Sequence, residues 1–291
     1  MPYLTLNGAR LYYEERGTGS ETIVFAHGLL WSGRMFDRQV AALQAHFRCI
    51  TFDFGGQGQS QVTASGYDMD TLTEDAAALI AALGCAPCHF VGLSMGGFVG
   101  MRLALRYPHW IRSLVLMETS ADPEPQETIG RYRLLNFIAR WFGWRMVVGR
   151  IMPILFGQQF LNDPARAPLR QTLKAALLRN HRVGLTRAVT GVIERASMDE
   201  DLNQIRVPTL IIVGDQDVAT VPAKAERIHA QIPGSRLVII AGAGHTSTVE
   251  EPEAVNQALL EFLGQERGRS GSAGIGHLYS LPCNAAGGVA R

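Results

Sequence analysis

Short runs of apolar residues alternate along the chain with longer segments in which apolar residues recur at helical spacing. The runs are typical of strands buried on both faces, and they lie at residues 22–26, 47–52, 89–92, 113–117, 209–213 and 236–240. The helical segments lie at residues 72–83, 96–107 and 221–232. Strands that alternate with helices in this way predict a mainly parallel sheet with right-handed crossovers.

The amino-terminal segment predicts a different strand pairing. Two short apolar stretches, at residues 3–6 and 10–15, flank Asn7-Gly8, a dipeptide that readily adopts the positive φ angles of a tight hairpin turn. We therefore expect these two strands to be antiparallel. Together with the buried runs they predict an α/β fold, in which a mainly parallel, twisted sheet of about eight strands is flanked by helices.

The alternation stops between residues 122 and 203, where the sequence contains helical patterns but no convincing strand. An all-helical insertion between two strands predicts a cap over the carboxyl edge of the sheet, where such sheets bind ligands. The last segment is rich in Gly, Ser, Arg and Ala, which predicts a flexible tail. The expected division is a first core part at 1–121, a helical cap at 122–203, a second core part at 204–263 and a tail at 264–291.

Composition excludes several classes of function. The 291 residues include 27 Lys and Arg against 26 Asp and Glu, which is too even a balance to attract nucleic acids or anionic membranes. No apolar run approaches the roughly 20 residues of a membrane span, and the amino terminus does not have the pattern of a secretory signal. We therefore expect a cytoplasmic protein whose partner is a small molecule.

One cysteine motif needs separate consideration. Cys85-Ala86-Pro87-Cys88-His89 matches the pattern of covalent haem attachment and, without His89, that of a redox dithiol. Haem attachment needs an export route, His89 begins a predicted strand, and no second Cys-x-x-Cys supplies further zinc ligands. We expect ordinary cysteines here, and neither a metal nor a cofactor.

The main candidate for chemistry is Gly92-Leu93-Ser94-Met95-Gly96, which lies between a predicted strand and a predicted helix. So sharp a turn forces its central residue into a strained backbone conformation. Side chains two positions before and after that residue would collide, so both of these positions require glycine. The motif thus presents the hydroxyl of Ser94 at the carboxyl end of its strand, as a candidate nucleophile.

A serine hydroxyl is a weak nucleophile and needs a nearby base that a third group orients. Of the eight histidines, His245 is the best placed, because its loop follows the predicted strand at 236–240. Asp215 and Asp217 both follow the strand at 209–213, and both are candidates for the acid. We prefer Asp217, further out on the loop, and expect Asp215 to hold a turn.

Several motifs together carry a resemblance to a known family. They are His27-Gly28-Leu29, Asp53-Phe54-Gly55-Gly56-Gln57-Gly58-Gln59-Ser60, the turn around Ser94, Gly214-Asp215-Gln216-Asp217, and Gly244-His245 with Glu250 and Pro252 downstream. From about Leu11 to Leu263 the chain resembles the α/β-hydrolase fold family, of the serine esterase and lactonase type. The resemblance implies Ser94 as nucleophile, His245 as base and Asp217 as acid.

The same resemblance implies an oxyanion hole formed by the backbone amides of Leu29 and Met95. An amide just after the nucleophile, at a helix amino terminus, is suited to hold a developing negative oxygen. His27 in this family more often braces its loop than takes part in the chemistry. One departure from the family pattern is Gly55, which stands where arginine is usual.

The cap is expected to select the substrate. It contains many aromatic and methionine residues, of which we expect Trp141, Trp144, Met146 and Phe156 to line an acyl pocket. The expected function is a cofactor-independent serine hydrolase that cleaves small to medium apolar esters or lactones through an acyl-enzyme. Two alternatives remain: a cofactor-free perhydrolase or haloperoxidase that uses the same triad with peroxide, and a binding module that retains the fold.

Overall fold

The computed structural model describes residues 2–272, and eight strands within them form one sheet with the order β1-β2-β4-β3-β5-β6-β7-β8. β1–β2 and β2–β4 are antiparallel pairs, and the other neighbouring strands are parallel, which confirms the predicted sheet. The strands are β1 (Tyr3–Leu6), β2 (Ala9–Arg16), β3 (Thr22–Ala26), β4 (Arg48–Phe52), β5 (Cys88–Leu93), β6 (Ile111–Met117), β7 (Thr209–Gly214) and β8 (Arg236–Ile240).

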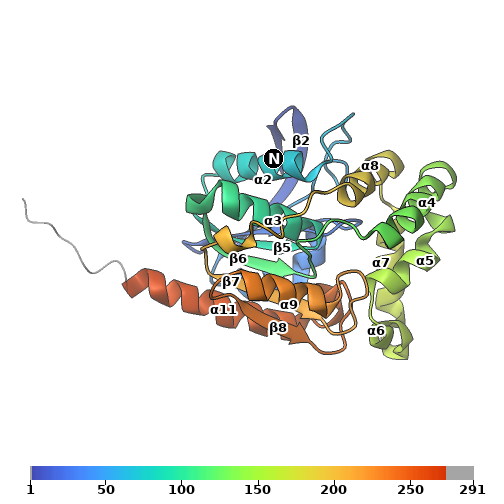
Figure 1. The fold of residues 1–291 in the computed structure, drawn as a ribbon. Coiled ribbons are helices and arrows are strands. Elements are labelled where there is room, and N and C mark those ends of the chain that lie inside the picture. The colour runs from blue at the N-terminus through green and yellow to red at the C-terminus, as the bar shows by residue number, and fades with distance from the viewer. Residues whose placement is uncertain (1, 273–291) are drawn as a thin grey trace, which may run out of the picture.

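Helices cover both faces of the sheet (Figure 1). α2 (Met69–Ala82), α3 (Met95–Arg106) and α9 (Pro222–Gln231) share one hydrophobic core with the sheet. α1 (Asp37–Leu43) and α11 (Pro252–Ser272) share the second core, on the opposite face, and the short α10 (Ser247–Glu250) precedes α11. The parallel strands are therefore buried on both faces, as their continuous apolar runs predicted.

Between β6 and β7 the chain forms only helices, in the segment for which the sequence predicted a cap. These helices lie together at one end of the molecule, beyond the sheet (Figure 1). They are α4 (Gln126–Phe142), α5 (Val148–Leu155), α6 (Gln158–Asn162), α7 (Ala167–Leu178) and α8 (Arg182–Ile193).

The carboxyl-terminal helix continues into the segment for which the sequence predicted a flexible tail. α11 continues to Ser272, whereas the predicted flexible tail begins at residue 264. The glycine-rich composition predicted a segment without regular structure from residue 264, but Gln265 and Glu266 favour helix and continue α11. The remainder of the predicted tail, residues 273–291, lies outside the described residues.

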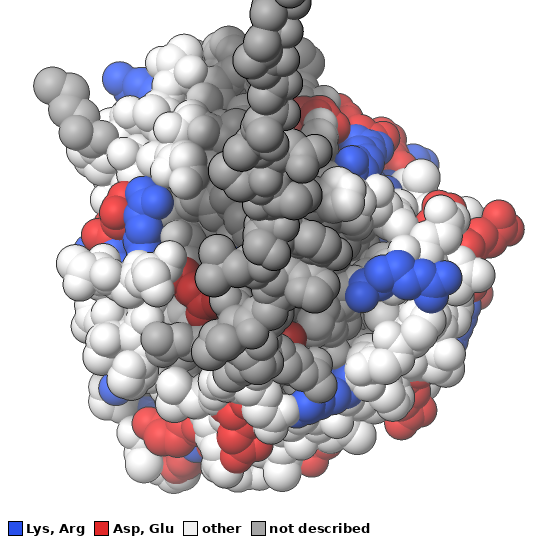
Figure 2. All heavy atoms as spheres, turned by 90° about the vertical axis from the view of Figure 1, so that its left-hand side faces the viewer, with Lys and Arg blue, Asp and Glu red and all other residues white. Residues whose placement is uncertain are grey.

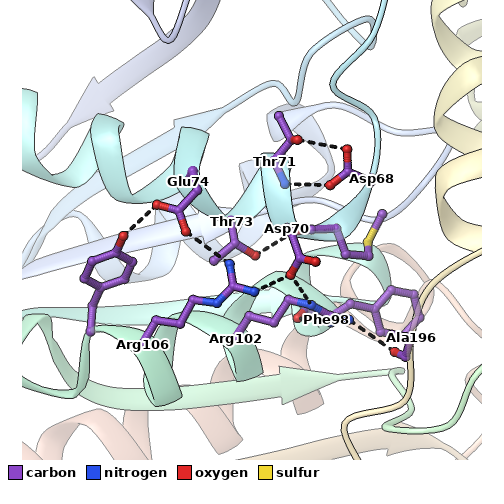
Figure 3. A network of polar contacts seen from close by, with 11 residues as sticks. Asp68, Asp70, Thr71, Thr73, Glu74, Phe98, Arg102, Arg106 and Ala196 are labelled. Atoms are coloured by element: carbon purple, nitrogen blue, oxygen red, sulfur yellow. Dashed lines mark hydrogen bonds and ion pairs between the residues drawn. The ribbon is translucent and has the colours of Figure 1, made fainter.

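A polar network joins α2 to α3, the helix that follows Ser94 (Figure 3). Arg106 pairs with Asp70 and, at 3.1 Å, with Glu74, while Nε of Arg102 lies 3.3 Å from Asp70. Exposed pairs of this kind contribute little individually. Arg102, however, is buried and also donates to the carbonyl of Ala196, 3.1 Å away, which ties α3 to the chain that leaves the cap.

The end of the molecule opposite the cap has a mixed surface (Figure 2). Among the described residues visible there, basic and acidic side chains are interspersed, in keeping with the balanced composition. Within residues 2–272, no helix combines the length and the apolar character that a membrane crossing requires.

Candidate active site

Ser94 lies in a strained turn between β5 and α3, with φ 52° and ψ −108°. A Cβ atom on Gly92 would lie 2.2 Å from the carbonyl oxygen of Gly96, and one on Gly96 would lie 2.0 Å from that of Ala26. Both contacts are with backbone atoms, which cannot move aside as a flexible side chain could. The turn therefore excludes side chains at both positions, as the motif predicted.

The structure brings together Ser94, Asp217 and His245, the three residues that the sequence predicted as a triad. Nε2 of His245 lies 3.0 Å from Oγ of Ser94, and Nδ1 of His245 lies 2.8 Å from Oδ2 of Asp217. All three residues are buried and lie at the carboxyl ends of β5, β7 and β8. Asp215 was expected to hold a turn in its own loop, but it accepts a hydrogen bond of 2.8 Å from the amide of Gly242, in the loop that follows β8.

The carboxylate of Asp217 is the acceptor for several donors. Ala219 and Thr220 donate backbone amides to Oδ1 at 2.8 and 2.9 Å, and the Thr220 hydroxyl donates to Oδ2 at 2.6 Å. Burial alone would raise the pKa of Asp217, but the charge of His245 and these hydrogen bonds outweigh burial, so the pKa is lowered. An ionised Asp217 keeps the proton of His245 on Nδ1, which leaves Nε2 free to accept one from Ser94.

Thr220 is a supporting residue that the sequence analysis missed. Besides its two bonds to Asp217, its hydroxyl oxygen lies 3.2 Å from Nδ1 of His245. It therefore helps to fix the position of the acid relative to the imidazole. The only signal in the sequence is a threonine three positions after the acid, which is common in turns.

The amides of Leu29 and Met95, which are expected to form an oxyanion hole, are positioned by different parts of the structure. Met95 is the first residue of α3, so the helix itself supplies no acceptor for its amide. Leu29 follows β3, and its amide belongs to the Gly28–Leu29 peptide. Phe54 donates its amide to Nε2 of His27 at 3.0 Å, so the proton of this imidazole is on Nδ1, which donates to the carbonyl of Gly28 at 2.7 Å.

This contact gives His27 a structural role in the loop. Burial lowers the pKa of His27, which keeps the imidazole neutral and so keeps Nε2 free to accept. In a planar trans peptide the N–H points away from the C=O, so an anchored Gly28 carbonyl also fixes the direction of the Leu29 amide. His27 thus braces its loop, as the sequence resemblance implied.

A second acid, Glu118, lies close behind the triad. It follows β6 in a left-handed conformation, with φ 40°, and is fully buried. Burial raises its pKa well above the ordinary value, and the charges of Asp217 and Glu250 add to the rise. Glu118 was not predicted as a site residue, although a charged residue directly after a predicted buried strand was a signal.

Glu250 connects the loop of His245 to the cap. Its carboxylate is buried and accepts hydrogen bonds from the amide of Thr246 at 3.0 Å and from the amide of Gly157 at 2.8 Å. Gly157 lies between α5 and α6, so one side chain holds both segments. Burial raises the pKa of Glu250 to about 7 in spite of these bonds.

The raised pKa of Glu250 predicts a pH-dependent stability. Its folded-state pKa of about 7 exceeds the ordinary value of 4.5, so its contribution is complete below pH 4.5 and is lost as the pH rises through 7. That shift corresponds to about 3 kcal/mol. The unfolding free energy of wild type minus that of Glu250→Gln, from denaturant titrations across this range, should fall by about this amount as the pH rises from 4.5 to 7. A difference that is constant with pH would contradict the prediction.

A cavity of about 140 Å³ lies beside Ser94 and His245. Its wall is mostly apolar and comes largely from the cap, and its members include Leu29, Leu135, Ile151, Ile154, Val189 and Val192. The space therefore adjoins the proposed nucleophile and favours an apolar group.

Only one of the four residues predicted for this pocket, Trp144, lies in the described wall. Trp141 and Met146 are 65% and 62% exposed, because α4 turns Leu135 and Ala139 inward and the short helix at residues 144–146 turns Trp144 inward. Phe156 is buried against Trp31 and Phe160 in the second core. The prediction was therefore wrong for Trp141, Met146 and Phe156.

The Cys-x-x-Cys-His segment lies in the core. Cys85 and Cys88 are free and buried, and Nδ1 of His89 lies 2.7 Å from the hydroxyl of Ser113 on the neighbouring strand. Within residues 2–272, no group of three or more His, Cys, Asp or Glu side chains is arranged to hold a metal ion.

The chain is similar to proteins of known structure and to one family model. The model described as "Alpha/beta hydrolase family" matches residues 23–258. A thermophilic esterase from Thermogutta terrifontis is 29% identical, with a TM-score of 0.84 over 91% of this chain and 98% of the esterase. The enol-lactonase from Burkholderia xenovorans LB400 is 28% identical, with a TM-score of 0.84 over 90% of this chain and 100% of the lactonase.

A further relative carries the name of a different activity. BpoC of Mycobacterium tuberculosis, whose name provisionally describes a non-heme bromoperoxidase, is 32% identical over 275 residues. The match covers 87% of this chain and 97% of that protein.

Proposed function

Because the chain belongs to the alpha/beta hydrolase family, we propose that it is a serine hydrolase that cleaves carboxylic esters or lactones with small to medium apolar acyl groups. The observation that carries this proposal is the hydrogen-bonded series from Ser94 through His245 to Asp217, with distances of 3.0 and 2.8 Å. These are the contacts that a serine needs in order to lose its proton to an oriented base.

The proposed reaction proceeds in two steps. Oγ of Ser94 attacks the carbonyl carbon while Nε2 of His245 takes the hydroxyl proton, and the amides of Leu29 and Met95 donate to the oxyanion. His245 then gives that proton to the leaving alcohol, and an acyl-enzyme remains. In the second step a water loses its proton to His245 and attacks the acyl carbon, which releases the acid and returns the proton to Ser94.

The size and polarity of the cavity support a modest apolar acyl group. A volume of about 140 Å³ has room for roughly ten water-sized groups, and most of its wall is apolar. The Thermogutta terrifontis esterase and the Burkholderia xenovorans enol-lactonase, both similar over most of this chain, also favour an ester or a lactone as substrate.

The proposal is tested by assaying the purified chain with nitrophenyl esters of increasing acyl length and with lactones, without any added cofactor. We expect sustained turnover that is highest for short to medium acyl chains and falls for long ones. A single burst without further turnover would indicate a binding module. Peroxide-dependent halogenation with no hydrolysis of either substrate class would overturn the proposal in favour of a haloperoxidase.

A further inference from the structure

Two buried polar atoms belong to residues in the wall of the apolar cavity and have no hydrogen-bond partner within residues 2–272. They are Oδ1 of Asn136 on α4 and Nε1 of Trp144, in the short helix that follows α4. A buried polar atom without a partner is unfavourable, and such atoms in folded proteins are few and usually have a reason. A substrate that supplies a donor for Oδ1 of Asn136 and an acceptor for Nε1 of Trp144 would be such a reason.

The identity of the free atom on Asn136 follows from its other contacts. Nδ2 of Asn136 lies 2.9 Å from the carbonyl oxygen of Thr186 and 3.3 Å from the hydroxyl of Thr190, both on α8. A backbone carbonyl only accepts, so the amide nitrogen must face α8 and Oδ1 must be the free acceptor. The indole nitrogen of Trp144 only donates. Two residues of the wall therefore carry, among their buried atoms, one acceptor that lacks a donor and one donor that lacks an acceptor.

The charges near these atoms favour a neutral ligand group. Glu124 and Arg195 also line the cavity, and they form an ion pair of 2.9 Å in which the Arg195 side chain is only 3% exposed. Nε of Arg195 also donates to the carbonyl of Asp122, 3.1 Å away. Because the two charges offset each other, neither an anionic nor a cationic ligand gains a large advantage. The group that best fits one acceptor and one donor without charge is an amide.

We propose that Asn136 and Trp144 form a polar subsite for a neutral amide in the acyl chain of the substrate. The N–H of the amide donates to Oδ1 of Asn136, and its carbonyl accepts from Nε1 of Trp144. The two residues lie on α4 and on the short helix at residues 144–146, which contacts α4, and both belong to the cap. This inference rests on the proposed ester or lactone hydrolysis and narrows its substrate class to acyl groups that contain an amide.

The test compares nitrophenyl esters of plain alkanoic acids with esters of equal length in which an amide replaces two methylenes. The amide is moved along the chain in a series, and the measured quantity is the ratio of kcat/KM for each amide ester to its alkanoate. We expect one amide position to give a ratio of at least about ten, because a site with unpaired polar groups discriminates against an analogue that leaves them unpaired.

Two variants show whether the named atoms cause this preference. Trp144→Phe removes the indole N–H but keeps an aromatic ring, and Asn136→Leu removes the free acceptor. Each should lower the ratio toward one at the preferred position. Trp141→Phe is the matched control, because Trp141 is 65% exposed and its loss should leave both the ratio and the alkanoate rates unchanged. A purely structural role, such as the tie from Asn136 to α8, would change both ester series equally and leave the ratio intact.

The outcomes separate this inference from the proposed function. A ratio near one at every amide position, with alkanoates hydrolysed, overturns the subsite and leaves the hydrolase proposal in place. Full retention of the ratio in both Trp144→Phe and Asn136→Leu also overturns the subsite. Failure to hydrolyse any ester or lactone overturns the proposed function and this inference with it.

Discussion

Replacing Ser94 with alanine is expected to lower kcat for ester hydrolysis by about 10⁶-fold, because a triad that lacks its nucleophile loses nearly all of its catalysis. The same change should abolish covalent labelling of the chain by an organophosphonate. Stability should change little, since the Ser94 side chain makes no capping hydrogen bond to α3 and alanine keeps the same Cβ in the strained turn. The loss of activity would then result from the loss of the nucleophile and not from unfolding.

The labelling experiment needs a serine control of similar burial. Ser235 is also buried, and its hydroxyl lies 2.9 Å from Nδ1 of His229, so a serine beside a histidine is present at a second place. Ser235→Ala should keep both turnover and labelling, with the label found on Ser94 by mass spectrometry of peptides. A Ser94→Ala chain that is still labelled at another serine, at the wild-type rate, would show that the nucleophile was wrongly assigned.

The sequence predicted the strands of the sheet well because each strand is encoded by its own short run of residues. A run such as residues 209–213 is short, apolar throughout and rich in β-branched residues, which is typical of a strand covered on both faces. The meeting of Ser94, Asp217 and His245 could be predicted for a related reason, since each follows a parallel strand and such strands end at the same edge. The distances between their side chains depend on loop conformation and could not be predicted.

The cap was less predictable, because its helices are apolar on more than one side. Along α4, Phe137 and Trp141 lie one turn apart on the exposed side, with their rings in contact, while Leu135 is buried, and packing against α8 decides which side is covered. Trp141 was consequently predicted inside and is exposed. Glu118 directly follows a predicted strand, which was a local signal, but its burial and that of Oδ1 of Asn136 come from distant segments, and no local pattern predicts that burial.

Asp217→Asn is expected to lower kcat by about 10⁴-fold, while Asp215→Asn should change it only a few-fold. Four donors meet the Asp217 carboxylate: the amides of Ala219 and Thr220, the Thr220 hydroxyl and Nδ1 of His245. Asparagine offers one acceptor oxygen in place of two. Its NH₂ group must therefore face either the two backbone amides, which meet Oδ1 in the wild type, or the Thr220 hydroxyl and the imidazole, which meet Oδ2.

If the NH₂ group of the new asparagine faces His245, Nδ1 becomes an acceptor and the proton moves to Nε2, where it blocks transfer from Ser94. Asp215 holds only the turn amide of Gly242, at 2.8 Å, and has no such influence on the imidazole. The rates of both variants with one nitrophenyl ester, measured from acid to alkaline pH, decide between the two aspartates. A larger loss in Asp215→Asn than in Asp217→Asn would reverse the assignment, because the acid that matters is the one that fixes the tautomer of His245.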